Sequence, residues 1–240
     1  MTDTPSIRLL IHGARGRMGA RISALAATDR RFSVVGAYDI DDRSRAESHQ
    51  RGSVDAIIDF SSDSGAQHAL ALAQRLQCAV VIGTTGLSPA TMAAVHAASR
   101  TVAVMVAANT SRGVAVANHL IAQAARLLGP AYHIDVVESH HAAKKDAPSG
   151  TALRMVKALK DGAGADVPPD RIHCIRAGDI IGEHMVQFAG PGERVQIAHI
   201  ATSRDVFAIG ALDAAAWLAG KPAGRYTIEQ SLGLVETPKR

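Results

Sequence analysis

The stretch IRLLIHGARGRMG, residues 7–19, decides the fold class of this chain. Its first six residues form a short apolar run that is typical of a buried strand. Gly13, Gly16 and Gly19 follow, and helical spacing of apolar residues continues to Ile22. The stretch therefore predicts a strand, a glycine turn and a helix, in that order.

A second apolar run, residues 32–39, completes a βαβ unit. It ends at Asp39, about 20 residues after the glycine turn, which is the spacing of dinucleotide-binding units. Short β-branched runs then alternate with helical patterns, which predicts a parallel, doubly wound Rossmann-type sheet covered on both faces. The further strands are expected at 54–61, 78–85 and 101–109, and the helices between them at 64–76 and 88–99.

The glycine turn has two interpretations. In a dinucleotide site, Gly13 allows the sharp exit from the strand, Gly16 lets amides approach a pyrophosphate, and Gly19 lets the helix pack closely on the sheet. The helix start then offers N–H groups and partial positive charge to phosphates. A purely structural turn is the alternative, because the spacing is not the usual G-x-G-x-x-G. The length of the βαβ unit and Asp39 favour the dinucleotide site.

Asp39 also bears on the choice of cofactor. A carboxylate at this place accepts hydrogen bonds from ribose hydroxyls and repels a 2′-phosphate, which favours NADH. Ile40 follows it, where an arginine would argue for NADPH. Since Arg15, Arg17 and Arg43 can reach a 2′-phosphate, use of both cofactors is expected, with a slight preference for NADH.

After residue 110 the pattern changes to an α+β second domain. It is expected to hold a mixed or antiparallel sheet, because one of its strands alternates as a half-covered strand does. The expected elements are helices at 113–128, 150–160 and 204–219, and strands at 133–140, 171–178, 183–190 and 193–201.

The segment SHHAAKKDAPSGTALRM, residues 139–155, joins a strand to a helix. Ser149, Gly150 and Thr151 begin the helix, so their amides can form a cradle for a carboxylate. Lys144 can add a full charge to the same anion. His140 and His141 should point to opposite faces of a regular strand, so one can act as acid or base at a pKa near 6.5 unless shifted.

This segment has two other interpretations. A solvated basic loop is compatible with its composition. A metal site is disfavoured, because zinc needs three or four ligands and the adjacent histidines offer two beside lysines. We therefore expect no metal.

Composition excludes several classes of protein. Net charge is +4, but the basic residues are dispersed and aromatics are 3%, so nucleic-acid binding is not expected. No apolar run reaches the roughly 18 residues that span a bilayer, and no secretory signal is seen. The expectation is a soluble cytoplasmic protein. Cys78 and Cys174 are expected to be reduced, buried thiols.

The motifs, taken together, resemble those of the 4-hydroxy-tetrahydrodipicolinate reductase (dihydrodipicolinate reductase) family. The likeness runs nearly end to end, and the segment E-x-H-H-x-x-K-x-D-A-P-S-G-T-A is its most specific part. The motifs that carry it are GARGRMG, IDFSS, VIGTTGL, AANTSRGV, ESHHAAKKDAPSGTA, RAGDIIGEH and GERVQIAHIATSRDVFAIGALDAAAWLAGK.

This resemblance implies a reaction and a set of site residues. The reaction is hydride transfer from NADH or NADPH to C4 of a cyclic dicarboxylate, with loss of water, in lysine and diaminopimelate synthesis. His140 is implied as the acid/base group and Lys144 as the second catalytic group. His141, Ser149, Gly150 and Thr151 match substrate-binding positions. The cofactor-binding positions implied are Gly13, Ala14, Arg15, Gly16, Arg17, Met18, Asp39, Gly83, Thr84, Thr85, Ala107, Ala108, Asn109 and Thr110.

The resemblance also implies an organisation. Residues 1–109 with 211–240 would form the dinucleotide-binding domain, and residues 110–210 the substrate-binding and tetramerisation domain of a homotetramer. Two other functions compete with this reductase. One is a diverged reductase acting on another imine or amino acid, and the other is a nucleotide-sensing protein without turnover, against which His140, Lys144 and the intact Ser149 turn argue.

Overall fold

The structure is a computed structural model that describes residues 6–236, without the side chains of Arg43 and Ser44. It divides into two compact units. The first comprises the described residues up to Ser111 together with those from Asp205 on, and the second runs from Arg112 to Arg204. Among the described residues, no helix combines the length and the apolar character needed to cross a bilayer.

The first unit is built on a six-stranded sheet in the order β10-β5-β4-β3-β1-β2. All its pairings are parallel. The strands are β1 (Ile7–His12), β2 (Phe32–Tyr38), β3 (Ala56–Asp59), β4 (Ala79–Ile82), β5 (Ala103–Val106) and β10 (Gly224–Tyr226).

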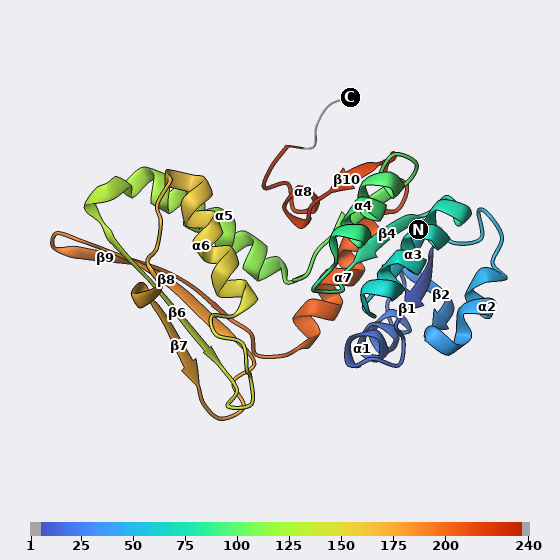
Figure 1. Ribbon diagram of the computed structural model, residues 1–240, viewed down its shortest axis with the longest axis horizontal. Helices are drawn as coiled ribbons and strands as arrows, with labels where there is room; N and C mark the ends of the chain where they lie inside the picture. The colour runs from blue at the N-terminus through green and yellow to red at the C-terminus, as the bar shows by residue number, and fades with distance from the viewer. Residues whose placement is uncertain (1–5, 237–240) are drawn as a thin grey trace. The chain divides into compact units, whose positions relative to one another are not determined.

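Helices cover both faces of this sheet (Figure 1). One face packs on α3 and α4 through a core that includes Leu10, Ile57 and Val80. The alternate side chains, such as Leu9 and Ile58, are equally buried, and α1 and α7 contact each other and the sheet there. The helices of this unit are α1 (Arg17–Ala26), α2 (Arg43–Glu47), α3 (Asp63–Leu76), α4 (Pro89–Ala98), α7 (Asp205–Leu218) and α8 (Ile228–Ser231).

The second unit holds a four-stranded mixed sheet in the order β7-β6-β8-β9. β7 runs parallel to β6, and the other pairs are antiparallel. Helices α5 and α6 lie side by side on one face of this sheet, over a core centred on Val136, Val186 and Phe188 (Figure 1). The elements are α5 (Arg112–Leu128), α6 (Gly150–Ala163), β6 (His133–His140), β7 (Ile172–Arg176), β8 (Glu183–Gly190) and β9 (Glu193–Ile200).

The predicted fold class is confirmed, with a parallel Rossmann-like sheet and a second, mixed sheet. The short elements α2, β10 and α8 were not expected from the sequence, because each spans five residues or fewer and shows too little periodicity. One expectation was wrong: Cys78 is buried, but Cys174 is exposed, because it lies on the edge strand β7.

Candidate active site

The glycine turn follows β1 at the carboxyl end of the first sheet. The amides of Gly13 and Ala14 donate to the carbonyl of Tyr38, which ties the turn to β2. Gly13 has φ +80°, and a Cβ there would overlap the carbonyl oxygen of Phe60. Gly16 is the N-cap of α1 and has no side chain, so no side-chain cap bonds the amides of the first turn. This arrangement suits a phosphate group.

A cavity of about 430 Å³ adjoins this turn. It brings together four of the cofactor-binding residues implied by the resemblance with six further lining residues, of which Ser61 is the end of an expected strand. The expected residues are Gly13, Arg15, Gly16 and Asp39; the others are His12, Ile40, Phe60, Ser61, Ser62 and Gly65.

The rim of the cavity at Asp39 is acidic. Asp39 accepts hydrogen bonds from the amides of Ile40 (2.9 Å) and Arg15 (3.1 Å), which hold the pKa of its carboxyl below the ordinary value. The guanidinium of Arg15 is paired with Asp41 (3.0 Å) and Asp42 (2.8 Å). Arg17 is exposed at the start of α1, and the side chain of Arg43 lies outside the described residues.

Behind the cavity, the buried carboxylate of Asp59 joins the ends of three neighbouring strands. It accepts hydrogen bonds from the hydroxyls of Ser61 (2.5 Å) and Thr84 (2.6 Å) and pairs with Nδ1 of His12 (2.8 Å). Thr84 also accepts from the amide of Ser61. The motif IDFSS contains Asp59 and Ser61, but the sequence does not show that Asp59 turns inward to join these strands.

The remaining expected cofactor positions differ in their surroundings. A Cβ on Gly83 would overlap the ring of Phe60. The hydroxyl of Thr110 donates to the carbonyl of Phe207, and Asn109 accepts from the amide of Ser111. Ala107 is buried, Met18 and Ala14 are half-buried, and Thr85 and Ala108 are exposed.

The close packing of α1 gives a first prediction. A Cβ on Gly19 would overlap the carbonyl oxygen of Gly13, so Gly19→Ala must push α1 away from the turn. We expect a loss of about 1–3 kcal/mol in the stability of this unit, as for other overpacked sites. We also expect NADH binding at least about tenfold weaker, equivalent to about 1.4 kcal/mol, in a fluorescence titration.

Gly162→Ala is the matched control for this substitution. There a Cβ would overlap the backbone of Ala122, in the second unit. This variant should lose stability without any change in the dissociation constant for NADH. Equal effects of Gly19→Ala and Gly162→Ala on NADH binding would refute the role given to the glycine turn.

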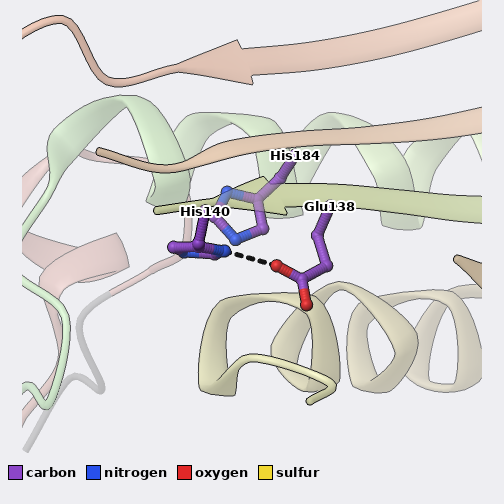
Figure 2. A group of neighbouring side chains, drawn as sticks. All are labelled: Glu138, His140 and His184. Carbon is purple, nitrogen blue, oxygen red and sulfur yellow. Dashed lines mark hydrogen bonds and ion pairs between the residues drawn. The ribbon is translucent and has the colours of Figure 1, made fainter. Parts of the chain in front are cut away.

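The second cluster of functional side chains lies on the covered face of the mixed sheet. Glu138 and His140 lie two residues apart on β6 and therefore share a face. His184 lies directly opposite Glu138 on β8. Figure 2 shows the carboxylate of Glu138 pointing to Nδ1 of His140, with the ring of His184 beside both. The ring centroids of His140 and His184 are 5.0 Å apart.

The start of α6 is joined to this cluster by Ser149. Its hydroxyl caps the helix by accepting from the amide of Ala152 (3.2 Å), and it lies 3.1 Å from Nε2 of His184. The amide of Ser149 donates to Oε1 of Glu138 (3.3 Å). The next residue, Gly150, is exposed and has open space where a Cβ would lie. The helix start therefore has an accessible side next to the cluster.

Two cations lie beside the cluster. Arg176 donates to Oε1 of Glu138 (2.7 Å) and to the carbonyl of Asp146 (2.5 Å). Lys144 is paired with the carboxylate of Asp146 at 2.7 Å. His141 follows the end of β6 and is half-buried, whereas His140 is 8% exposed. Of the two adjacent histidines, His140 is the one held on the covered face.

Burial and charge set the protonation of the cluster. Burial lowers the pKa of His140 below its ordinary value, against the opposing effect of Glu138. Burial also lowers the pKa of His184, to about 4, so this ring is neutral at pH 7. For Glu138, burial would raise the pKa, but hydrogen bonds from Arg176, Cys174 and His140 lower it below the ordinary value. The cluster therefore has an ionised carboxylate beside two histidines.

Glu138, His140 and His184 also have the residue types of a metal site, with ligand atoms within 4.8 Å of one another. However, the carboxylate of Glu138 already pairs with Arg176 and accepts from His140 and Ser149. Its charge is balanced by these groups. We therefore describe the cluster as a hydrogen-bonded acid/base network.

Glu138, Arg176 and His184 were not expected as site residues from the sequence. The signal for Glu138 was present, since residues two apart on a strand share a face. Arg176 and His184 come from other strands, and only the pairing of β6 with β7 and β8 brings them to this cluster.

Comparisons with known proteins agree over nearly the whole chain. Residues 7–110 match the family model for the dihydrodipicolinate reductase N-terminus, and residues 113–232 match that for its C-terminus. A 4-hydroxy-tetrahydrodipicolinate reductase of Xanthomonas axonopodis pv. citri is 45% identical and covers 94% of this chain and 97% of its own length. Another, of Anaeromyxobacter dehalogenans, is 39% identical and covers 95% of this chain and 98% of its own length.

Solved structures show the same fold. A dipicolinate-bound dihydrodipicolinate reductase from Paenisporosarcina sp. TG-14 has a TM-score of 0.74 at 19% identity, covering 93% of this chain and 98% of its own. An engineered D-amino acid dehydrogenase has a TM-score of 0.57 at 14% identity, covering 93% of both chains. By its two family matches and its full-length identity to curated reductases, this chain belongs to the dihydrodipicolinate reductase family.

Proposed function

We propose that this protein reduces 4-hydroxy-tetrahydrodipicolinate to tetrahydrodipicolinate with NADH or NADPH, in lysine and diaminopimelate biosynthesis. One observation carries this assignment: curated reductases of that name are 44–45% identical over 94% of the chain. The diverged reductase and the nucleotide sensor are not favoured, because no feature of the site requires another substrate or prevents turnover.

In this proposal the first unit binds the nucleotide and the second unit binds the substrate. The unit with the glycine turn holds the nucleotide, with the pyrophosphate at the start of α1 and the adenine ribose at Asp39. The amides of the α1 start, which no side chain caps, and the sharp turn that Gly13 makes at φ +80° fit this group. When bound, the reduced nicotinamide supplies a hydride to C4 of the substrate ring, from which water is lost.

The second unit binds the dicarboxylate and moves a proton. The start of α6 binds one carboxylate through Gly150 and Thr151, with Lys144 adding a positive charge and His141 as a further substrate contact, and Ser149 holds this helix start in place through Glu138 and His184. His140 gives a proton from Nε2 to the ring once the hydride has been added. The dipicolinate-bound relative supports a small dicarboxylate as the kind of ligand.

A cofactor assay tests this function. The substrate is generated in the cuvette by condensing pyruvate with aspartate semialdehyde, and the absorbance of NADH or NADPH is followed separately. Loss of absorbance that depends on both condensation partners is expected. No loss with either cofactor would refute the assignment, and binding of NADH without turnover would support the nucleotide sensor.

We further propose a preference for NADH. Asp39 and Arg15 line the cavity where a 2′-phosphate would lie, and the guanidinium of Arg15 is engaged by the carboxylates of Asp41 and Asp42. A 2′-phosphate would be repelled by these charges.

The double variant Asp41→Asn, Asp42→Asn tests this preference. It releases the guanidinium of Arg15 and removes two negative charges, so kcat/KM for NADPH should rise by about tenfold, a coupling of about 1.4 kcal/mol. The kcat/KM for NADH should change little. Asp161→Asn, on the exposed surface of α6, is the control, and a rise of the same size there would contradict the argument.

The uncovered face of the mixed sheet supports a homotetramer. Ile175 and Ile200 are 46% and 61% exposed and lie in one row across the sheet, through Ser139 and Glu183. Apolar residues on an uncovered sheet face are typical of an interface. Light scattering should give four times the mass of the chain.

We propose a cytoplasmic location, where the nicotinamide cofactors of biosynthesis are found.

A further inference from the structure

We infer that Glu138 is a positioning residue, which orients the imidazole of His140 and fixes it relative to the carboxylate-binding start of α6. This inference rests on the proposed function, and it concerns a residue that contacts neither substrate nor cofactor in that proposal. Glu138 is fully buried, and both of its carboxylate oxygens are engaged by different parts of the second unit.

One oxygen of Glu138 orients the histidine. Oε2 is hydrogen-bonded to Nδ1 of His140, so Nδ1 carries a proton toward the carboxylate and Nε2 is the nitrogen that faces a ligand. After Nε2 has given up its proton, the ring is left as the Nδ1–H tautomer, which Glu138 stabilises. The carboxylate also favours the imidazolium that must form before each transfer.

The other oxygen of Glu138 fixes the helix start. Oε1 accepts from the amide of Ser149 at 3.3 Å and from Arg176 at 2.7 Å, and Arg176 also donates to the carbonyl of Asp146. One carboxylate therefore holds both the proton donor and the segment that leads into α6. A shift of either would move the donor relative to the bound ring, which is costly in an oriented site.

The space at Nε2 of His140 is kept open by a glycine. A Cβ built on Gly182 would lie 3.1 Å from Nε2. The charged and titratable groups that surround the ring are Glu138 on its own strand, Lys144 after that strand, Arg176 on β7 and His184 on β8. Among these, Glu138 is the carboxylate that favours the protonated ring.

The test compares Glu138→Gln with Glu138→Asp in the full-length protein. The glutamine removes the charge and keeps the shape, so kcat should fall by about 10- to 100-fold, as when a partner that orients a histidine is lost. Because the charge of Glu138 raises the pKa of His140 against burial, its removal lowers that pKa further. The protonated acid is then lost at lower pH, and the descending limb of the kcat/KM profile should move to lower pH.

Glu138→Asp retains the charge, so its descending limb should stay near the wild-type position although kcat falls. The dissociation constant for NADH should be unchanged in both variants, because the nucleotide is held by the first unit. Circular dichroism spectra like that of the wild type at the assay temperature show that the second unit is folded as well. Glu193→Gln, on the exposed end of β9, should match the wild type throughout.

The outcomes separate this inference from the proposed function. If the wild type shows no reductase activity, the function is wrong. If the wild type is active and Glu138→Gln keeps its kcat, or loses kcat with an unmoved pH profile, Glu138 has no positioning role. A shifted limb in Glu138→Gln with an unshifted limb in Glu138→Asp supports the inference.

Discussion

Replacing His140 with alanine is expected to lower kcat by a factor on the order of 10² or more, with the affinity for NADH nearly unchanged. His140 is the buried member of the histidine pair, and its Nδ1 is held by Glu138. Alanine removes the one imidazole of the described cluster that is hydrogen-bonded to the carboxylate of Glu138, which favours its protonated form. The effect should therefore fall on the chemical step.

Steady-state kinetics measure kcat, and a fluorescence titration measures the affinity for NADH. His96→Ala, on the exposed surface of α4, is the matched control and should retain wild-type kcat. If His140→Ala lost NADH binding while kcat at saturation survived, the residue would belong to the nucleotide site and the assignment would be wrong. A wild-type kcat would show that the proton comes from another group.

Lys144→Ala is expected to lower kcat by a similar factor, on the order of 10² or more, and also to raise KM for the dicarboxylate. Lys144 pairs with Asp146, whose carbonyl accepts from Arg176, so its ammonium is held near the start of α6. An anion bound there would gain a charge-assisted hydrogen bond from Lys144. Loss of that charge weakens binding of the dicarboxylate and leaves the substrate ring less well oriented.

Lys157→Ala provides the comparison. Lys157 lies on α6, in the same unit as Lys144. It pairs with Asp161 in an exposed ion pair, but it is not part of the cluster. It should show unchanged kcat and KM, because exposed pairs contribute little. If Lys144→Ala behaved in the same way, the charge of Lys144 would have no part in substrate binding or turnover.

The first unit could be predicted almost entirely from the sequence. Its signals are local: the glycine turn at Gly13, the acidic end of β2 at Asp39, and strands and helices that alternate. In a parallel sheet these local signals also indicate where a ligand lies, because the strand ends gather at one edge. What the sequence did not show was the inward orientation of Asp59, which depends on side chains from neighbouring strands.

The second unit was less predictable, because its site depends on strand pairing. His140 and Ser149 were identified from one continuous segment. Their connection through Glu138 and Arg176 requires β7 beside β6, and His184 requires the antiparallel register of β8. Cys174 was wrongly expected to be buried, since an apolar neighbourhood in the sequence does not reveal an edge strand. The lowered pKa of His140 likewise follows from burial that only the fold produces.

The most direct test of the central claim is to follow the transferred hydrogen. Wild-type protein is given NADH carrying two deuterium atoms at C4 of the nicotinamide, together with substrate made from pyruvate and aspartate semialdehyde, and the product is examined by NMR. We expect one deuterium at C4 of the tetrahydrodipicolinate ring for each NADH consumed. Oxidation of NADH without deuterium in the ring, or no oxidation at all, would contradict it.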